Sequence, residues 1–388
     1  MSIILDGTSG VTTPGVTNTG NDTVSGNETI TGTLTASNFN AASSFGFKNR
    51  IINGAMVIDQ RNAGASVTIT ANPQYTVDRW FAGVSNASKI SVQQSSTAPS
   101  GFTKSMLVTS LAATTPAAGD VYYMQQSIEG FNVADLDFGL ATAKTITISF
   151  WVRSSLTGTF GAVLLNAGSN RSFPFNYTIS AANTWTQITQ TIAGDTTGTW
   201  ATDNTTGFQL RVGLGAGSTY QGVAGSWGTT NAVTTTTATN VVGTNGATFY
   251  ITGVQLEVGS KATTFDTRAY GQELALCQRY FYKNKGDGSG NGPYGMGHCR
   301  SNYLRGLIHL PVIMRTTPTM TNTGTDADYI VTSGTSDFTS FVTRPSLDNG
   351  GNQILAFRVQ VSTGMTNGYA ALLSLNSSSS YLDFSAEL

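Results

Sequence analysis

Short segments in which apolar and polar residues alternate recur in this chain from about residue 45, and residues typical of turns separate them. Alternation with a period of two gives an extended strand one face for a core and one for solvent. Many short strands at this spacing predict a β-sandwich or jelly roll. The segments are Ser66–Thr70, Lys89–Gln94, Lys104–Thr109, Val121–Ile128, Thr145–Arg153, Gly161–Leu165, Trp185–Ile192, Phe208–Val212 and Thr248–Leu256.

The composition favours folded β-structure over disorder. Charged residues make up only 11% of the chain, against about 25% in an ordinary globular domain. The 39% hydrophobic and 10% aromatic content can bury enough apolar area to offset the entropy of ordering. Neutral polar side chains therefore cover most of the surface, and such surfaces do not repel each other in oligomers.

Several classes of function are excluded by what the chain lacks. The net charge is -1 and no cluster of Lys and Arg follows the chain, so we expect no nucleic-acid partner. We find no membrane span, and the segment Met1–Asp6 has no basic start of a signal peptide, so we expect folding in a cytoplasm. Cys277 and Cys299 are interpreted as small buried hydrophobic residues, with a disulfide or a metal site as alternatives. We expect no cofactor.

Residues 1–44 differ from the rest, with no Lys or Arg and one aromatic residue, Phe39. Val24, Ile30 and Leu34 have even numbers, so they share one face of an extended chain. One such ribbon cannot fold alone, whereas three wound around an axis can. We therefore expect an attachment arm or β-stalk in a homotrimer. A disordered tail is the alternative.

Three regions follow from these patterns: an arm at 1–44, a jelly-roll β-sandwich at 45–269, and a linker helix with a C-terminal β-sandwich-like domain at 270–388. The fold class is therefore all-β. The helix is predicted over Tyr270–Tyr282, with Leu274, Cys277 and Phe281 on one face. Further strands are expected at an Asn49–Arg61 pair turning at Asn53-Gly54, at an edge strand over Leu310–Pro318, and at Ile354–Val361, Tyr369–Ser374 and Tyr381–Leu388.

A series of motifs lies in order along residues 45–282. They are Asn49–Met56 with Gln60-Arg61, Tyr75–Trp80, Gln126–Gly130 with Ala134–Leu136, Ala143–Arg153, Tyr250–Glu257, Thr264–Asp266, Glu273-Leu274 and Cys277–Tyr280. In this order they resemble a family of bacteriophage tail-fibre and virion proteins, and the resemblance implies a fibre that attaches to other tail components. The same stretch is more distantly similar to jelly-roll carbohydrate-binding modules, although Thr252-Gly253 stands where such modules often carry an acidic residue.

Residues for catalysis are scarce. There is no Gly-x-Ser-x-Gly elbow, and His298-Cys299 are neighbours that point to opposite faces of a strand. Asp135 and Asp137 are interpreted as turn caps, and Asp326 and Asp328 as solvated loop residues, rather than as a glycosidase pair. We expect no catalytic residue and no metal ligand. The alternatives are His298 as a metal ligand on an oligomer axis and a depolymerase site built from distant segments or neighbouring chains.

Sugar binding requires exposed aromatic faces beside amides and hydroxyls. Gly-rich segments carry isolated candidates of this kind: Trp200, Tyr220, Gln221 and Trp227. These rings could equally pack over the sandwich ends or against a neighbouring chain. The other tryptophans, Trp80, Trp151 and Trp185, lie in alternating strands and are predicted to belong to the core. Arg153 and Glu257 are expected to form a structural ion pair or turn bonds.

The sequence therefore predicts a virion protein of the phage tail that mediates adsorption to a host cell-surface polysaccharide and catalyses nothing. Its partners would be other copies of itself and a tail or baseplate protein held through the arm. One alternative is a purely structural connector or decoration fibre. The other is a glycan-degrading tailspike.

Overall fold

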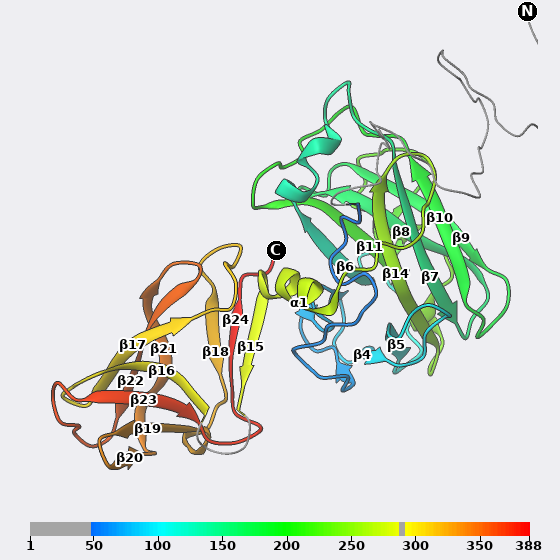
Figure 1. Ribbon diagram of the computed structural model, residues 1–388. Coiled ribbons are helices and arrows are strands. Elements are labelled where there is room, and N and C mark those ends of the chain that lie inside the picture. The colour runs from blue at the N-terminus through cyan, green and yellow to red at the C-terminus, as the bar shows by residue number, and fades with distance from the viewer. Residues whose placement is uncertain (1–47, 287–291) are drawn as a thin grey trace, which may run out of the picture. The chain divides into compact units, whose positions relative to one another are not determined.

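The computed structural model describes residues 48–286 and 292–388, which form paired β-sheets in two regions of the chain (Figure 1). The all-β prediction is confirmed for these residues, whose only α-helix is α1 (Tyr270–Gln278). The predicted arm at 1–44 lies outside the described residues. No helix in the described ranges is long and apolar enough to cross a membrane.

The first sheet of the N-terminal region has six strands in the order β1-β4-β5-β14-β7-β10, and we call it the β14 sheet. All its pairs are antiparallel. The strand β14 pairs with β5 and β7, which come much earlier in the chain, as the crossing connections of a jelly roll require. The strands are β1 (Val67–Thr68), β4 (Ile90–Ser95), β5 (Ser105–Ser110), β14 (Thr248–Val258), β7 (Ile146–Ser154) and β10 (Thr186–Ile192).

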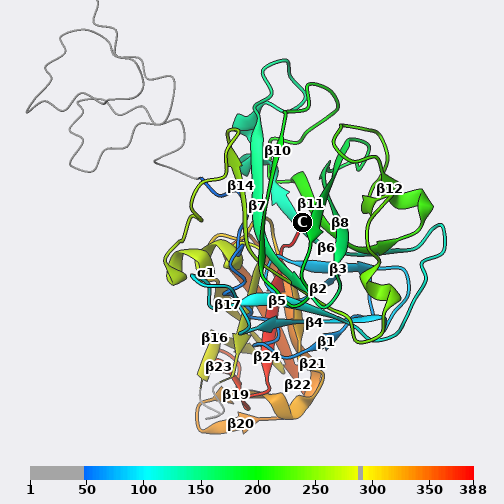
Figure 2. The same cartoon turned by 90° about the vertical axis from the view of Figure 1, so that its right-hand side faces the viewer.

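The second sheet also has six strands, in the order β2-β3-β6-β11-β8-β9, and we call it the β11 sheet. A short parallel pair, β12 (Gln221–Gly222) and β13 (Thr234–Thr235), lies against its outer face (Figure 2). Gly161 and Gly213 permit this approach, because a Cβ at either position would collide with Thr234. The strands are β2 (Gln74–Tyr75), β3 (Phe81–Val84), β6 (Val121–Glu129), β11 (Thr206–Ala216), β8 (Gly158–Asn166) and β9 (Ser172–Ile179).

The main core lies between these two sheets and follows from the alternation. In β7 the even-numbered residues from Ile146 to Val152 are buried, and in β11 those from Phe208 to Leu214 are buried. Rings from the two sheets meet there, with the Phe150 and Tyr177 centroids 5.3 Å apart at a steep angle. Burying each such side chain contributes about 1.5–3 kcal/mol, so this layer holds the sandwich together.

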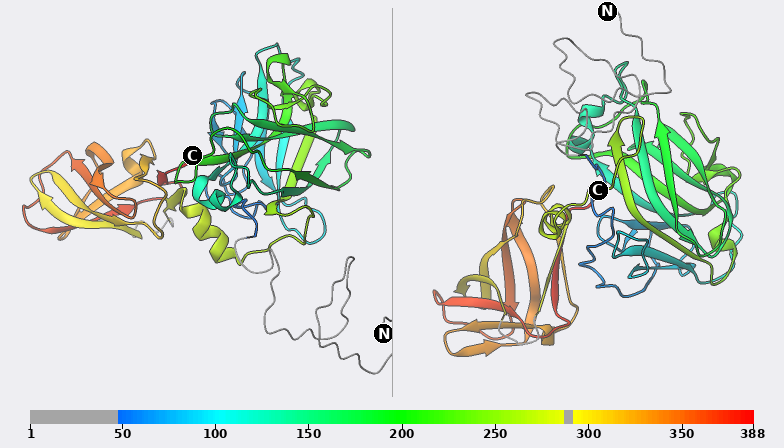
Figure 3. Two further views of the ribbon diagram at one scale, coloured as in Figure 1. Left: turned by 90° about the horizontal axis from the view of Figure 1, so that it is seen from above. Right: turned by 45° about the vertical axis from the view of Figure 1, so that its right-hand side comes forward.

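The C-terminal region pairs a three-stranded sheet, β15-β24-β18, with a seven-stranded sheet, β20-β19-β23-β16-β17-β22-β21 (Figure 3, yellow to red). Phe384 and Phe357 are buried in their shared core. The first three strands are β15 (Phe281–Lys285), β24 (Tyr381–Ser385) and β18 (Thr319–Asn322). The other seven are β20 (Ser336–Phe338), β19 (Tyr329–Ser333), β23 (Ala370–Leu375), β16 (Gly292–Arg300), β17 (Tyr303–His309), β22 (Ile354–Val361) and β21 (Phe341–Gly350).

Most of the expected elements are present in the structure. All nine alternating segments overlap strands, and so do the three expected strands after residue 350. The helix ends at Gln278, earlier than predicted, and Phe281 begins β15 instead. Leu274 and Cys277 do pack together in a small cluster with Ile52 and Tyr280. Cys277 and Cys299 are buried free cysteines, as expected.

The strand prediction is wrong for two segments. Asn49–Arg61 turns at Asn53 but forms no strand pair, because side chains replace the ladder: the Asn53 amide donates to the carbonyls of Ile58 and Asp78. Leu310–Pro318 is likewise irregular. Its backbone N–H groups form isolated hydrogen bonds rather than a strand ladder, and Met314 N–H donates to the Asn352 carbonyl at 2.8 Å. Its prolines have no N–H to donate.

Candidate functional site

Trp200 is part of the core rather than an exposed platform. It is 8% exposed, and its ring lies 4.9 Å from both Phe138 and Phe208, centroid to centroid. Its indole N–H donates to the Thr197 carbonyl at 3.0 Å. Of the two alternatives for this ring, the structure shows packing over the sandwich end, and Trp200 does not offer an exposed face for a ligand. A large aromatic side chain in a glycine-rich loop can therefore still pack into the core, where the loop crosses the end of the sandwich.

Trp227 joins the same aromatic cluster from another loop. It is half-buried, and its ring centroid lies 5.5 Å from that of Trp200 and 5.4 Å from that of Phe173. Its indole N–H donates to the Ala193 carbonyl at 2.8 Å. Most of its surface thus serves to close the end of the core, which is the packing alternative for these rings.

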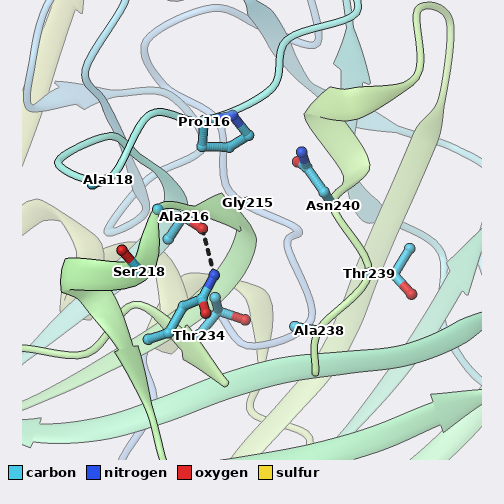
Figure 4. A pocket seen from close by; sticks show the side chains of 11 residues that line it. Pro116, Ala118, Gly215, Ala216, Ser218, Thr234, Ala238, Thr239 and Asn240 are labelled. Carbon is cyan, nitrogen blue, oxygen red and sulfur yellow. Dashed lines mark hydrogen bonds between the residues drawn. The ribbon is translucent and has the colours of Figure 1, made fainter. Parts of the chain in front are cut away.

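Tyr220 and Gln221 lie elsewhere, at the start of β12, and both are half-buried. Gln221 lines a cavity of about 410 Å³ and donates its side-chain N–H to the Ala216 carbonyl at 2.8 Å (Figure 4). The Asn240 amide oxygen is buried without a donor among the described residues. The lining has no aromatic ring, and it consists of Pro116, Ala118, Gly215–Ser218, Gln221, Thr234 and Ala238–Asn240.

Of the three tryptophans predicted to lie in the core, one is buried there and two lie on the outer face of a sheet. Trp80 is fully buried. Trp151 and Trp185 are only half-buried and lie on the outer face of the β14 sheet. In β7 the even-numbered residues are in the core, so Trp151 shares the outward face with Ser149 and Arg153. The core prediction is wrong for Trp151 and Trp185.

These two rings belong to a larger group that we call the aromatic face, defined as Phe102, Trp151, Trp185, Tyr250 and Phe265. Tyr250 lies directly opposite Arg153, whose guanidinium carbon is 5.0 Å from the centroid of its ring. The Trp185 ring meets Tyr250 at 6.0 Å, centroid to centroid. Each of the five side chains is half-buried, so each is held by packing while part of its surface faces solvent.

A cavity of about 500 Å³ opens beside Trp151 on this face. Phe102 and Phe265 form one wall, with ring centroids 5.1 Å apart. Gly253 forms part of the floor at a φ of +62°, and a Cβ there would lie 2.6 Å from the Phe102 ring. The lining combines rings with short polar groups: Ser100–Phe102, Ser149, Trp151, Gln187, Gly253, Ala262–Phe265 and Thr267.

Polar groups that can bind a ligand stand next to the rings. Gln187 is exposed and lies directly opposite Trp151, and within the described ranges its amide has no hydrogen-bond partner. Arg153 donates its Nε–H to the Asn183 carbonyl at 2.8 Å and forms no ion pair with any described residue. Rings for the apolar side of a pyranose, beside a free amide and a cation, are the groups that bind sugars.

Several charged residues that the sequence analysis singled out form hydrogen bonds or ion pairs within the fold. Glu257 is buried and accepts from the Thr263 backbone N–H at 2.9 Å and hydroxyl at 2.6 Å. It therefore forms the expected turn bonds, whereas no bond links it to Arg153. Asp135 pairs with Arg50 at 2.9 Å and Asp326 with Arg344 at 2.8 Å.

His298 and Cys299 point to opposite sides of β16, one exposed and one buried. In the part of the chain that the structure describes, no group of three His, Cys, Asp or Glu side chains could hold a metal ion.

No family model matches this sequence, and no curated protein matches it. Among solved structures, similarity is found to a putative sugar-binding protein from Bacteroides thetaiotaomicron, with 13% identity over 55% of this chain and 100% of that one, and a TM-score of 0.33. A family 11 carbohydrate-binding module from Clostridium thermocellum, complexed with a β-1,3-1,4-mixed-linked tetrasaccharide, gives 12% identity, coverage of 52% and 100%, and a TM-score of 0.28.

The enzymatically active domain of tailspike protein 4 from bacteriophage CBA120 gives 12% identity over 54% of this chain and a TM-score of 0.30. This chain spans 21% of the length of that domain. Identities and TM-scores of this size are too low to transfer a ligand or an activity from any of the three proteins.

Proposed function

We propose that this chain binds a bacterial surface glycan through the aromatic face of its β14 sheet, as part of a phage tail fibre. The observation that carries the glycan-binding part is the position of Trp151. Its half-buried ring borders a cavity and lies directly opposite Gln187, whose exposed amide has no hydrogen-bond partner among the described residues. A pyranose stacked on the ring could exchange hydrogen bonds with that amide.

The tail-fibre part is supported by the sequence motifs in residues 45–282. In this proposal the protein resides in the virion tail and assembles as a homotrimer, and residues 1–44 attach it to a tail or baseplate protein. Several weak glycan sites in one oligomer raise its avidity for a cell surface. Binding without catalysis is part of the same proposal.

The test is adsorption of purified protein to host cells and to a glycan array, with two matched double variants. Trp151→Ala/Trp185→Ala removes the centre of the aromatic face. Tyr220→Ala/Gln221→Ala alters the cavity of Figure 4 and serves as its control. The proposal expects the first variant to lose at least about tenfold in affinity, or about 1.4 kcal/mol, because it removes two rings on which a sugar can pack, while the second retains binding.

If Tyr220→Ala/Gln221→Ala loses binding while Trp151→Ala/Trp185→Ala retains it, the glycan binds at the cavity of Figure 4, and the proposed site on the aromatic face is wrong. Absence of any host binding by the wild type, with tight binding to a tail protein, would favour a purely structural fibre. Release of sugars from the glycan by the wild type would establish a tailspike enzyme and would contradict the non-catalytic part of the proposal.

A further inference from the structure

The seven-stranded sheet of the C-terminal region has a second face that no described part of the chain covers. In β17 the even-numbered Leu304 and Ile308 are buried, while Arg305 and Leu307 point outward and are exposed. The neighbouring strands alternate in the same way, so His298 on β16 and Arg358 on β22 are exposed beside them. This outward face is not part of the proposed glycan site on the β14 sheet.

Basic side chains on this face stand directly opposite one another. The register places His298 opposite Arg305, and Arg305 opposite Arg358. Side chains at opposite positions of adjacent antiparallel strands are about 5 Å apart at Cβ, and like charges there destabilise the sheet. Arg300 adds a further exposed cation two residues beyond His298. We call His298, Arg300, Arg305 and Arg358 the cationic row.

One carboxylate offsets this charge only in part. Asp348 lies 3.9 Å from the Arg305 guanidinium and 3.7 Å from that of Arg358, so two arginines share one acid. The two arginine side chains are 44% and 45% exposed, which leaves their remaining N–H groups open to a ligand. A sheet that keeps opposed cations with one shared counter-ion has a surplus of positive charge on an accessible surface.

An apolar row runs beside the cationic row, one step along the strands. Met296 lies opposite Leu307, and Leu307 lies opposite Ala356. Met296 is 69% exposed and Leu307 is 51% exposed, so two large apolar side chains face solvent next to each other. Together with Tyr294 and His309 they line a cavity of about 480 Å³.

We propose that this face binds an anionic glycan, a polysaccharide whose sugars carry carboxylate or phosphate groups. Guanidinium groups bind such oxyanions with paired hydrogen bonds. The apolar row would contact the C–H face of the adjoining sugar ring. Nucleic acid is disfavoured because its binding depends on many phosphate contacts, whereas this row has four members and the whole chain has a net charge of -1.

The test measures binding of the full chain to immobilised polygalacturonate, with fully methyl-esterified pectin as the uncharged counterpart. A teichoic acid supplies the phosphate-bearing arm. Arg305→Gln/Arg358→Gln removes the centre of the cationic row, and Arg344→Gln is the matched control, an exposed arginine on the same sheet that already pairs with Asp326. Thermal unfolding of each variant verifies folding.

The proposal expects the wild type to bind at least one of the two anionic polymers and to bind esterified pectin far more weakly. The double variant should lose at least about tenfold in affinity, because two charge-assisted contacts are removed, while Arg344→Gln retains it. Binding of neither anionic polymer, equal binding of the esterified form, or equal binding by the double variant would overturn the proposal. Tighter binding of single-stranded DNA than of either polymer would assign the face to nucleic acid.

The cationic row and the aromatic face can fail separately. Arg305→Gln/Arg358→Gln should leave binding of an uncharged array glycan unchanged, because the aromatic face lies on a different sheet. If Trp151→Ala/Trp185→Ala loses anionic binding while Arg305→Gln/Arg358→Gln retains it, the anion site lies on the β14 sheet and this inference is wrong.

Discussion

Trp151 and Gln187 lie directly opposite each other on β7 and β10, on the outer face of the β14 sheet. Opposite residues of antiparallel strands are the closest side-chain neighbours that a sheet provides. The sheet therefore fixes the spacing between a half-buried ring and an exposed amide, and a ligand need not order a loop before it binds. That rigidity limits the entropy lost on binding and makes this pair the centre of the proposed site.

Gly253→Ala should weaken glycan binding and lower stability. The φ of +62° is unfavourable for alanine, and its Cβ would lie 2.6 Å from the Phe102 ring and 3.1 Å from that of Trp151. We expect a loss of about 1–2 kcal/mol in the free energy of unfolding from the backbone alone, and a displaced ring on the aromatic face. Denaturant unfolding and glycan titration measure the two effects. Gly246→Ala is the control, because Gly246 has a φ of +76° and no neighbour within 4 Å of a Cβ; equal loss of glycan binding in both variants would contradict the role of Gly253.

Trp200→Ala should destabilise the fold far more than Trp151→Ala. The Trp200 ring is packed among Phe138, Phe208 and Trp227, and removal of a buried Trp leaves a cavity that costs about 3–5 kcal/mol. Trp151 leaves part of its ring in solvent, so its loss should cost less. Urea unfolding of both variants measures the difference. A smaller effect for Trp200→Ala than for Trp151→Ala would show that the Trp200 ring is not a core element.

The strands could be predicted from the sequence, but the orientation of Trp151 and Trp185 was missed. The signal was present in the alternation itself: Ile146, Ile148, Phe150 and Val152 have even numbers, so an odd-numbered ring in the same strand faces outward. The core prediction rests on their lying in alternating strands, which establishes the strand but not the face that each ring occupies. The phase of the pattern, odd against even within one strand, decides the face.

Other parts of the site could not be predicted from one sequence. Phe102 and Phe265 meet beside Trp151 only because β14 pairs with β5 and β7, and local patterns do not determine long-range pairing. The exposure of the loop tryptophans could not be predicted for a related reason. Whether Trp200 faces solvent depends on the sandwich end that it covers, which lies far away in the sequence.

Asp78→Asn should change how stability depends on pH. Asp78 is fully buried, and burial raises its pKa from 3.8 to about 6 in spite of Arg61 at 3.6 Å. A raised carboxyl pKa contributes stability at low pH that is lost as the pH rises through about 6. The variant lacks this titration, so its free energy of unfolding should improve relative to the wild type between pH 4 and pH 8, by on the order of 3 kcal/mol.

Asp203→Asn provides a control of opposite sign. The Thr205 hydroxyl and backbone N–H donate to the exposed Asp203 carboxylate and hold its pKa below the ordinary value. This group contributes stability that is lost as the pH falls. The free energy of unfolding of Asp203→Asn should therefore decrease relative to that of the wild type as the pH rises. Urea titrations at several pH values give both trends. A pH-independent difference for Asp78→Asn would contradict the buried, proton-binding carboxyl.

Arg305→Gln should leave stability unchanged or raise it slightly. Arg305 lies directly opposite Arg358 on the neighbouring strand, and its removal relieves opposed like charges at the loss of one contact to Asp348. The melting temperature at low salt, where surface charges are least screened, measures this effect. A clear drop in melting temperature would mean that the cationic row has a structural role.

The most direct test of the account follows the five tryptophan indole N–H signals by NMR while the host glycan is added. Assignment by single Trp→Phe variants separates Trp80, Trp151, Trp185, Trp200 and Trp227. The account predicts that the signals of Trp151 and Trp185 shift with a common saturation curve, while those of Trp80 and Trp200 stay in place. Shifts confined to Trp200 and Trp227, with Trp151 and Trp185 unchanged, would contradict it.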